Sequence, residues 1–194
     1  HLILDLIHGI YNYDGKVLWT QLRVENDTLL TGYRITNGWA RVNYTYFAIS
    51  FSKPIQQYGC VEKGKVDYKG GYGKFDMTHN FPDMGGRKLV TYFDFDPKAG
   101  SELEVKVALS GVSTAGALKN LQAEAASFSF DQLAAQAAKR WEQALSAIDA
   151  KGSDDQLAML YTSLYHTMIN PCVYMDVDGQ YRGLDHNIHQ ADGF

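Results

Sequence analysis

The sequence contains few of the features that define disulfide-rich, membrane-spanning or nucleic-acid-binding proteins. Only two cysteines occur in 194 residues, too few for a disulfide framework. We expect Cys60 and Cys172 to be buried free thiols, with one bridge as the alternative. No apolar run approaches the roughly 20 residues that cross a bilayer, so no membrane span is expected. The 18 Lys and Arg residues do not cluster and the net charge is −4, which argues against a nucleic-acid partner.

Several sequence motifs of catalysis are also absent. The sequence has no Gly-x-Ser-x-Gly elbow, no GxxxxGK[ST] phosphate loop, no GxGxxG after a strand and no HExxH helix. Residues 1–7 alternate in polarity like a strand, whereas a signal sequence has a basic start and an apolar run. We therefore expect this chain to begin within a fold and to contain no signal sequence. Its length fits one large domain, or one domain and part of a second.

Up to about residue 127, apolar and polar residues alternate with the period of β-strands. Strands are expected over 17–24, 29–35, 43–51, 58–68, 88–95 and 103–110. In the last of these, Leu103, Val105, Val107 and Leu109 are expected to share one buried face. Gly, Asp and Asn clusters separate the strands, and no helical pattern interrupts them. The pattern predicts a mainly β fold, an antiparallel β-sandwich.

From Ser127 onward the apolar residues recur at every third and fourth position, as on one face of a helix. Helices are expected over 131–148 and 153–169, opened by the capping-box pairs Ser129 with Gln132 and Ser153 with Gln156. Pro171 ends the second helix. We therefore expect a β-sandwich domain over residues 1–127 and a helical segment over residues 128–194. Two helices cannot bury their apolar faces alone, so they need other elements to pack on.

A few polar and aromatic residues are candidates for a site. Trp39 and Arg41 place a ring beside a guanidinium, as in many sugar-binding sites, although packing in the core or in an interface is the default interpretation for Trp39. The stretch 176–179 resembles half of a calcium loop, but a hairpin that reverses at Asp178-Gly179 explains it better. A metal cluster can also be drawn from residues 185, 186, 189 and 192, against the default of a solvated loop. We assign no metal ligand here.

Read together and in order, several motifs resemble glycoside hydrolase family 92, the bacterial α-mannosidases. The motifs are GWAR at 38–41, YFAISFSKP at 46–54, VKVALSGVS at 105–113, NLQAE at 120–124, FD at 130–131, Trp141, LYTSLYH at 160–166 and DGQYRGLD at 178–185. The resemblance implies a β-sandwich, a helical linker at 131–148 and the start of an (α/α)6 barrel at 153–169. It also implies inverting, calcium-dependent hydrolysis of α-mannosides, with α-1,2-linked mannose of glycans as the expected substrate.

The same resemblance sets expectations for the site, the cofactor and the location. Trp39, Arg41, Tyr181, Arg182 and Asp185 are the expected substrate-binding residues. Family members are several times longer, so the catalytic acid and base and the calcium ligands are expected outside this segment, which should be inactive by itself. A bacterial periplasmic or extracellular location is implied.

Two other classes of protein remain open. One is a non-catalytic sandwich that binds carbohydrate, with Trp39, Arg41 and neighbouring tyrosines as the binding face. The other is a structural module whose exposed helical face drives self-association. That face is made of Leu157, Leu160, Tyr161, Leu164, Tyr165 and Met168.

Overall fold

The computed structural model describes residues 1–61, 79–125, 127, 129–170 and 172–192. These residues form two compact units. The first unit comprises His1–Glu124 and Met175–Phe194, and the second comprises Ala125–Tyr174. None of the described helices is both long enough and apolar enough to span a bilayer.

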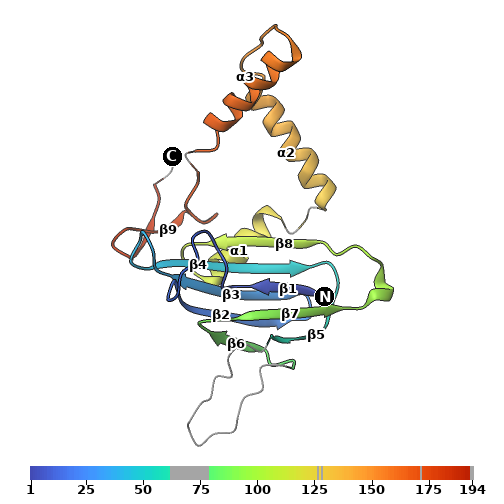
Figure 1. Ribbon diagram of the computed structural model, residues 1–194, viewed down its shortest axis with the longest axis vertical. Coiled ribbons are helices and arrows are strands. Elements are labelled where there is room, and N and C mark those ends of the chain that lie inside the picture. Colours follow the sequence, from blue (N-terminus) through green and yellow to red (C-terminus); the bar gives the residue numbers. More distant parts are fainter. Residues whose placement is uncertain (62–78, 126, 128, 171, 193–194) are drawn as a thin grey trace, which may run out of the picture. The chain divides into compact units, whose positions relative to one another are not determined.

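The larger sheet of the first unit has five antiparallel strands in the order β6-β2-β3-β4-β8 (Figure 1). The strands are β2 (Val17–Asn26), β3 (Leu29–Thr36), β4 (Asn43–Phe51), β6 (Asp83–Gly86) and β8 (Val105–Ser110). The turn between β2 and β3 is held by Asn26, whose Oδ1 accepts a hydrogen bond from the Thr28 amide at 2.9 Å. Asn and Asp stabilise such turns because their short side chains bond to the backbone two residues on.

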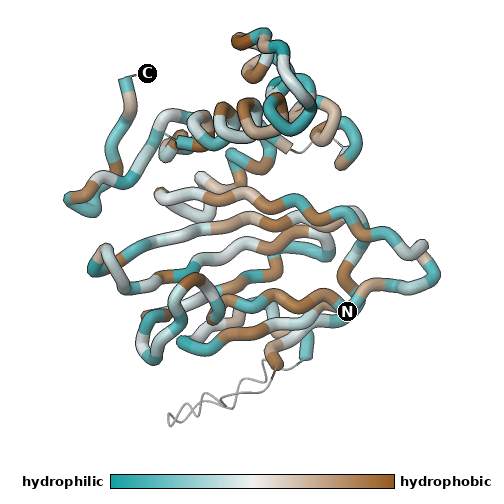
Figure 2. The backbone as a smooth tube through the Cα atoms, turned by 45° about the horizontal axis from the view of Figure 1, so that its top comes forward, coloured by the Kyte–Doolittle hydropathy of each residue, from teal (hydrophilic) through white to brown (hydrophobic). Residues whose placement is uncertain are grey.

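A smaller sheet pairs β1 (Leu2–Asp5), β7 (Val90–Phe95) and β5 (Ile55–Cys60) in the order β1-β7-β5, and a short 3-10 helix, η1 (Pro97–Ala99), follows β7. The two sheets share one core. Phe51 of β4 meets Phe95 of β7 edge to face, with ring centroids 5.1 Å apart. The buried cluster consists of Leu6, Leu22, Leu30, Phe47, Ile49, Phe51, Ile55, Met84, Leu89 and Phe93. Apolar and polar stretches alternate along the strands in Figure 2. The predicted mainly β, antiparallel fold is confirmed. The remainder of the strand expected over 58–68 lies outside the described residues.

The predicted buried face of strand β8 is wrong. Val105, Val107 and Leu109 are 40%, 58% and 58% exposed, whereas Ala108 and Ser110 on the other face are buried. The reason is that β8 lies at the edge of its sheet. The described core cluster contains no residue of β8. Alternation shows that a strand has two different faces, but it does not show which face is covered.

What covers the other face of β8 is a helix that the sequence pattern did not predict. Helix α1 (Thr114–Glu124) packs against β8 and β4. Ala117 and Leu121 of α1 are buried, as is Ala48 of β4. Ala48 pairs with Ala108 in the sheet, and these short side chains allow the helix to approach closely.

The second unit contains α2 (Phe130–Leu145) and α3 (Asp154–Thr167). Both predicted capping boxes are confirmed, with reciprocal bonds at each helix start. The helices contact each other through Trp141 and Tyr165, whose ring centroids lie 4.5 Å apart. The Tyr161 hydroxyl also donates to the Ile148 carbonyl at 2.9 Å. Neither helix has a buried residue, so the pair lacks a core of its own.

The last described residues return to the first unit as a hairpin of β9 (Gln180–Arg182) and β10 (Ile188–Gln190). The turn expected at Asp178-Gly179 is present, but it does not join two strands. Gly179 does have the positive φ of a turn, at 79°, but no strand is assigned to the described residues 172–176 before it. The chain reverses at this turn, where the Asp176 amide donates to the Gln180 carbonyl and the Gly179 amide donates to the Asp176 carbonyl, both at 2.8 Å. It reverses again between Arg182 and Ile188, which pair directly across the two strands.

Candidate functional site

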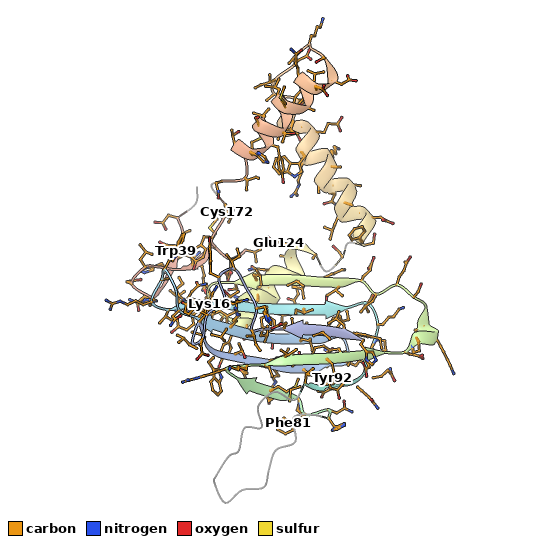
Figure 3. The ribbon with its side chains drawn as sticks, viewed as in Figure 1. Lys16, Trp39, Phe81, Tyr92, Glu124 and Cys172 are labelled. Atoms are coloured by element: carbon orange, nitrogen blue, oxygen red, sulfur yellow. The ribbon has the colours of Figure 1, made fainter. Side chains whose placement is uncertain are left out.

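The candidate residues Trp39 and Arg41 lie in the connection between β3 and β4. Thr36 and Asn43 pair at its base, and the Tyr13 hydroxyl braces it from another loop by donating to Asn37 Oδ1 at 2.7 Å. Trp39 is fully exposed, and Figure 3 shows it in this connection, far from the shared core of the sheets. Packing of Trp39 in the core is therefore wrong, packing in an interface stays a prediction, and the ring is accessible to a ligand in this chain.

Arg182 connects the hairpin to the same end of the sandwich. Its Cζ atom lies 4.6 Å from the ring centroid of Tyr44, at the start of β4. Its Nε and Nη2 donate to the carbonyls of Gly111 and Val112 at 2.9 and 3.0 Å, and its Nη1 donates to the His186 carbonyl at 2.8 Å. A planar guanidinium can satisfy several acceptors at once because its donors are fixed in one plane. Most of the hydrogen-bonding capacity of Arg182 therefore holds the backbone, and its role as a sugar contact stays a prediction.

Asp185 organises the turn of the hairpin. Its carboxylate accepts bonds from His189 Nε2 at 3.0 Å and from the backbone and side-chain nitrogens of Asn187. These bonds, that of His189 foremost, lower the pKa of Asp185 to about 2. Tyr181 lies beside His189, with ring centroids 5.6 Å apart. Asp185 is therefore an ionised acceptor near neutral pH, suited to bind hydroxyl groups and unsuited to act as an acid.

Gly183 lies inside this turn because no side chain fits there. A Cβ at Gly183 would be 2.6 Å from Asp185 Oδ1 and 2.8 Å from the His189 ring. Sequence spacing grouped Asp185 with His189 only as a possible metal cluster, and nothing in the sequence pointed to Asn187 as a partner of Asp185.

Residues 176–179 do not form a calcium site. Asp176 is buried against Ser110 and Asn120, and Asp178 is paired with Lys119 at 2.7 Å. This bond lowers the pKa of Asp178 and raises that of Lys119. Among the described residues no group of three or more His, Cys, Asp or Glu is arranged to hold a metal ion. The calcium dependence implied by the resemblance stays a prediction.

Comparison with known proteins places this sandwich and its helical segment in a class. The chain matches the model of the glycosyl hydrolase family 92 N-terminal domain over residues 1–110 and that of the family's catalytic domain over residues 116–194. It combines a β-sandwich domain with catalytic-domain sequence. The chain belongs to glycosyl hydrolase family 92. No match was found among curated proteins.

Solved structures of this family are similar to the chain over nearly its whole length. The family GH92 α-mannosidase BT3965 of Bacteroides thetaiotaomicron, in complex with mannoimidazole, is 34% identical over 99% of the chain, with a TM-score of 0.86. The inverting mannosidase BT2199 of Bacteroides thetaiotaomicron VPI-5482 is 26% identical over 97% of the chain, with a TM-score of 0.75. The chain spans only 24% of either structure.

Proposed function

We propose that the chain is part of an α-mannosidase that hydrolyses α-1,2-linked mannose of glycans by an inverting, calcium-dependent mechanism. The observation that carries the proposal is the similarity of 99% of the chain to an α-mannosidase structure with mannoimidazole bound. An inverting glycosidase needs one carboxylic acid for the leaving oxygen and one carboxylate for a water, about 6.5 to 9.5 Å apart. We assign this pair, and the calcium ligands, to catalytic-domain sequence beyond these 194 residues. A bacterial periplasmic or extracellular location fits a substrate of this kind.

In this proposal the sandwich supplies part of the surface that binds the glycan. Trp39 offers a fully exposed ring to the apolar face of a sugar. Arg41 is exposed and makes no hydrogen bond or ion pair within the described part of the chain, so its donors are available to sugar hydroxyls. Tyr181 and the ionised Asp185 add an aromatic ring and an acceptor from the hairpin, as binding sites that combine apolar walls with a few polar groups do.

Two assays test the proposal at different levels. The 194-residue chain with calcium should not turn over an α-mannoside, whereas the intact gene product should be much heavier than 21.7 kDa and active. Robust turnover by the short chain would contradict the assignment of the catalytic pair. An intact product that is inactive on α-1,2-mannobiose would contradict the substrate.

The exposure of Trp39 also supports a second candidate, a non-catalytic carbohydrate-binding sandwich. Glycan-array binding by the 194-residue chain should weaken about tenfold or more in Trp39→Ala, because ring stacking contributes on the order of 1 kcal/mol or more. Trp39→Phe keeps a ring and should lose less. Phe130→Ala is the matched control, since it removes a 72% exposed aromatic ring from α2 in the other unit. Circular dichroism checks that each variant is folded. Equal binding by all four proteins would exclude Trp39 from the glycan surface.

A further inference from the structure

Asp176 is a buried carboxylate for which the proposed function has no role. The residue is only 5% exposed. Oδ2 accepts a hydrogen bond from Ser110 Oγ at 2.7 Å and Oδ1 accepts one from Asn120 Nδ2 at 2.9 Å. Ser110 is the last residue of β8 and Asn120 lies in α1. Burial of a carboxylate is costly unless it is hydrogen-bonded. The buried position of Asp176 is therefore stable only if Ser110 and Asn120 are held in position.

Those donors are themselves fixed. Ser110 Oγ accepts bonds from the amides of Val112 and Ser113 at 2.9 and 3.2 Å, which orients its hydroxyl hydrogen toward Asp176. Asn120 Nδ2 also donates to the Leu109 carbonyl at 2.9 Å. A polar network in which every member is satisfied specifies one geometry.

Asn120 also binds the segment that contains Asp176. Its Oδ1 accepts a bond from the Val177 amide at 2.9 Å, so one amide side chain contacts two consecutive residues of the returning chain. The chain leaves the first unit after α1, at residue 125, and re-enters it at residue 175. Asn120 of α1 binds the chain directly after this point of return, at Asp176 and Val177.

Gly116 of α1 makes room for this contact. A Cβ at that position would be 2.1 Å from Asp176 Oδ2 and 2.8 Å from Ser110 Oγ. A helical glycine costs about 1 kcal/mol relative to alanine. This cost is explained by the approach of the carboxylate, since Gly116 is itself buried in the helix face that carries Asn120.

Arg182, six residues after Asp176, binds the backbone that directly follows Ser110. Asp176 binds Ser110, and Arg182 donates to the carbonyls of Gly111 and Val112, the next two residues. Between them the chain turns, with the Gly179 amide donating to the Asp176 carbonyl at 2.8 Å. The hairpin that begins at Gln180 is thereby fixed at two points on the end of β8.

We propose that Asp176 and Arg182 are positioning residues that hold the β9–β10 hairpin on the sandwich, so that Tyr181 meets a mannose-containing glycan. The inference rests on the proposed function for its second half only. It also accounts for a feature of the family comparison. Residues 116–194 match the catalytic-domain model, yet α1 and residues 175–192 fold with the sandwich.

The decisive variant is Asp176→Asn in the 194-residue chain. An amide has the same shape but directs an N–H group at one of the two donors, Ser110 or Asn120. Asp178→Asn is the matched control, because it changes an exposed carboxylate of the same turn that is paired with Lys119. Two further variants test the attachment of the hairpin. Gly116→Ala displaces the Asp176 carboxylate. Arg182→Lys keeps the charge but loses the planar donors to Gly111 and Val112.

Two readouts separate positioning from binding. Hydrogen exchange at the hairpin amides of Gly183 and Ala191, which bond to Asn187 and Gly179, should become about tenfold faster or more in Asp176→Asn and Gly116→Ala. Arg182→Lys should give a smaller acceleration. Amides of β3 should change less than about twofold, which shows that the sandwich is still folded. The Kd for α-1,2-mannobiose, measured by calorimetry, should rise about tenfold with the exchange rate, and Asp178→Asn should move neither.

The outcomes are distinguishable. Unchanged hairpin exchange in Asp176→Asn and Gly116→Ala overturns the positioning role. Faster exchange with unchanged mannobiose affinity overturns the link to the glycan surface while the positioning role stands. Absence of mannobiose binding by the unmodified chain overturns that link and weighs against the proposed glycan surface, and the exchange measurement still decides the positioning role.

Discussion

Arg182 on β9 lies over the ring of Tyr44 on β4, with its Cζ atom 4.6 Å from the ring centroid. This contact joins residues that are far apart in the sequence and places the hairpin next to the strand that follows the Trp39 connection. Such cation–π contacts contribute from about 0.5 kcal/mol at exposed sites to about 2 kcal/mol when desolvated.

We predict that a double-mutant cycle of Arg182→Gln and Tyr44→Leu gives a coupling energy of about 0.5 to 2 kcal/mol in the free energy of unfolding. Urea denaturation of the four proteins measures it. Arg182→Gln with Tyr33→Leu is the control cycle. Tyr33 contacts the Tyr46 ring at 5.8 Å and should show no coupling to Arg182. Equal coupling in both cycles would mean that Arg182 does not act through the Tyr44 ring.

Gly32 permits the close packing of β3 under Phe47, and we predict that Gly32→Ala is strongly destabilising. A Cβ there would be 2.3 Å from the Gln21 carbonyl oxygen and 2.4 Å from the Phe47 ring. Phe47 belongs to the shared core and has little room to move. Overpacking of this kind costs about 1 to 3 kcal/mol or more.

The matched control for Gly32→Ala is Gly9→Ala. A Cβ at Gly9 would approach only the guanidinium of Arg34, at 3.2 Å, and the end of a long side chain can shift. Thermal unfolding followed by circular dichroism should show a large drop in Tm for Gly32→Ala and a small one for Gly9→Ala. Similar Tm values for both variants would show that the backbone around Gly32 relaxes easily.

The hairpin should loosen in acid because Asp185 holds its turn. The pKa of Asp185 falls from 3.8 to about 2, chiefly through His189. A group with a lowered folded-state pKa adds stability that is complete above the unfolded pKa and is lost as the pH falls through the folded pKa. Protection of the hairpin should therefore be constant above about pH 4 and decline between about pH 4 and 2.

NMR titration of the Asp185 carboxyl group measures this directly. In His189→Ala the pKa of Asp185 should rise toward its ordinary value, since the first of its hydrogen-bond donors is gone, and the loss of hairpin protection should begin at higher pH. Asp178→Asn, which is expected to leave the hairpin exchange and the Asp185 bonds unchanged, serves as the control. An Asp185 pKa that is the same with and without His189 would contradict the assignment.

The sequence predicted those elements whose signal is local. Strands β2, β3, β4 and β7 follow the alternation of their own residues, and α2 and α3 begin at capping boxes that are visible as Ser-x-x-Gln. Helix α1 was missed because Gly116 and Asn120 are weak helix formers. They are present because Asp176 packs against them.

Contacts between distant residues explain the other errors. The partner of Asp176 is 56 positions away, and no periodic pattern reports such a pair. Alternation predicted the wrong buried face for β8 because it cannot show how far the second sheet extends over the first. Among the candidate site residues, exposure of Trp39 and the use of Arg182 by the backbone both depend on this tertiary arrangement.

The helical unit should make the 194-residue chain self-associate. Helix α3 has no buried residue, and the predicted stripe of apolar residues along it includes Leu160 and Tyr165 at 37% and 39% exposure. An open groove of about 620 Å³ is lined by residues of α2, among them Leu133 and Trp141, together with Met168. Because apolar surface of this kind gains free energy when it leaves water, we expect oligomers whose size grows with protein concentration.

Leu160→Lys tests whether the α3 stripe is the contact, since a charge in an apolar interface is costly. Met159→Lys is the matched control. Met159 is 64% exposed and lies outside the stripe, and the substitution introduces the same residue, lysine, which is a good helix former. Light scattering should show a smaller mass for Leu160→Lys at equal concentration and no change for Met159→Lys. A monomeric unmodified chain would contradict self-association, and an equal response to both variants would move the interface away from the stripe. Two amphipathic helices that share no core must bury their apolar faces on another partner.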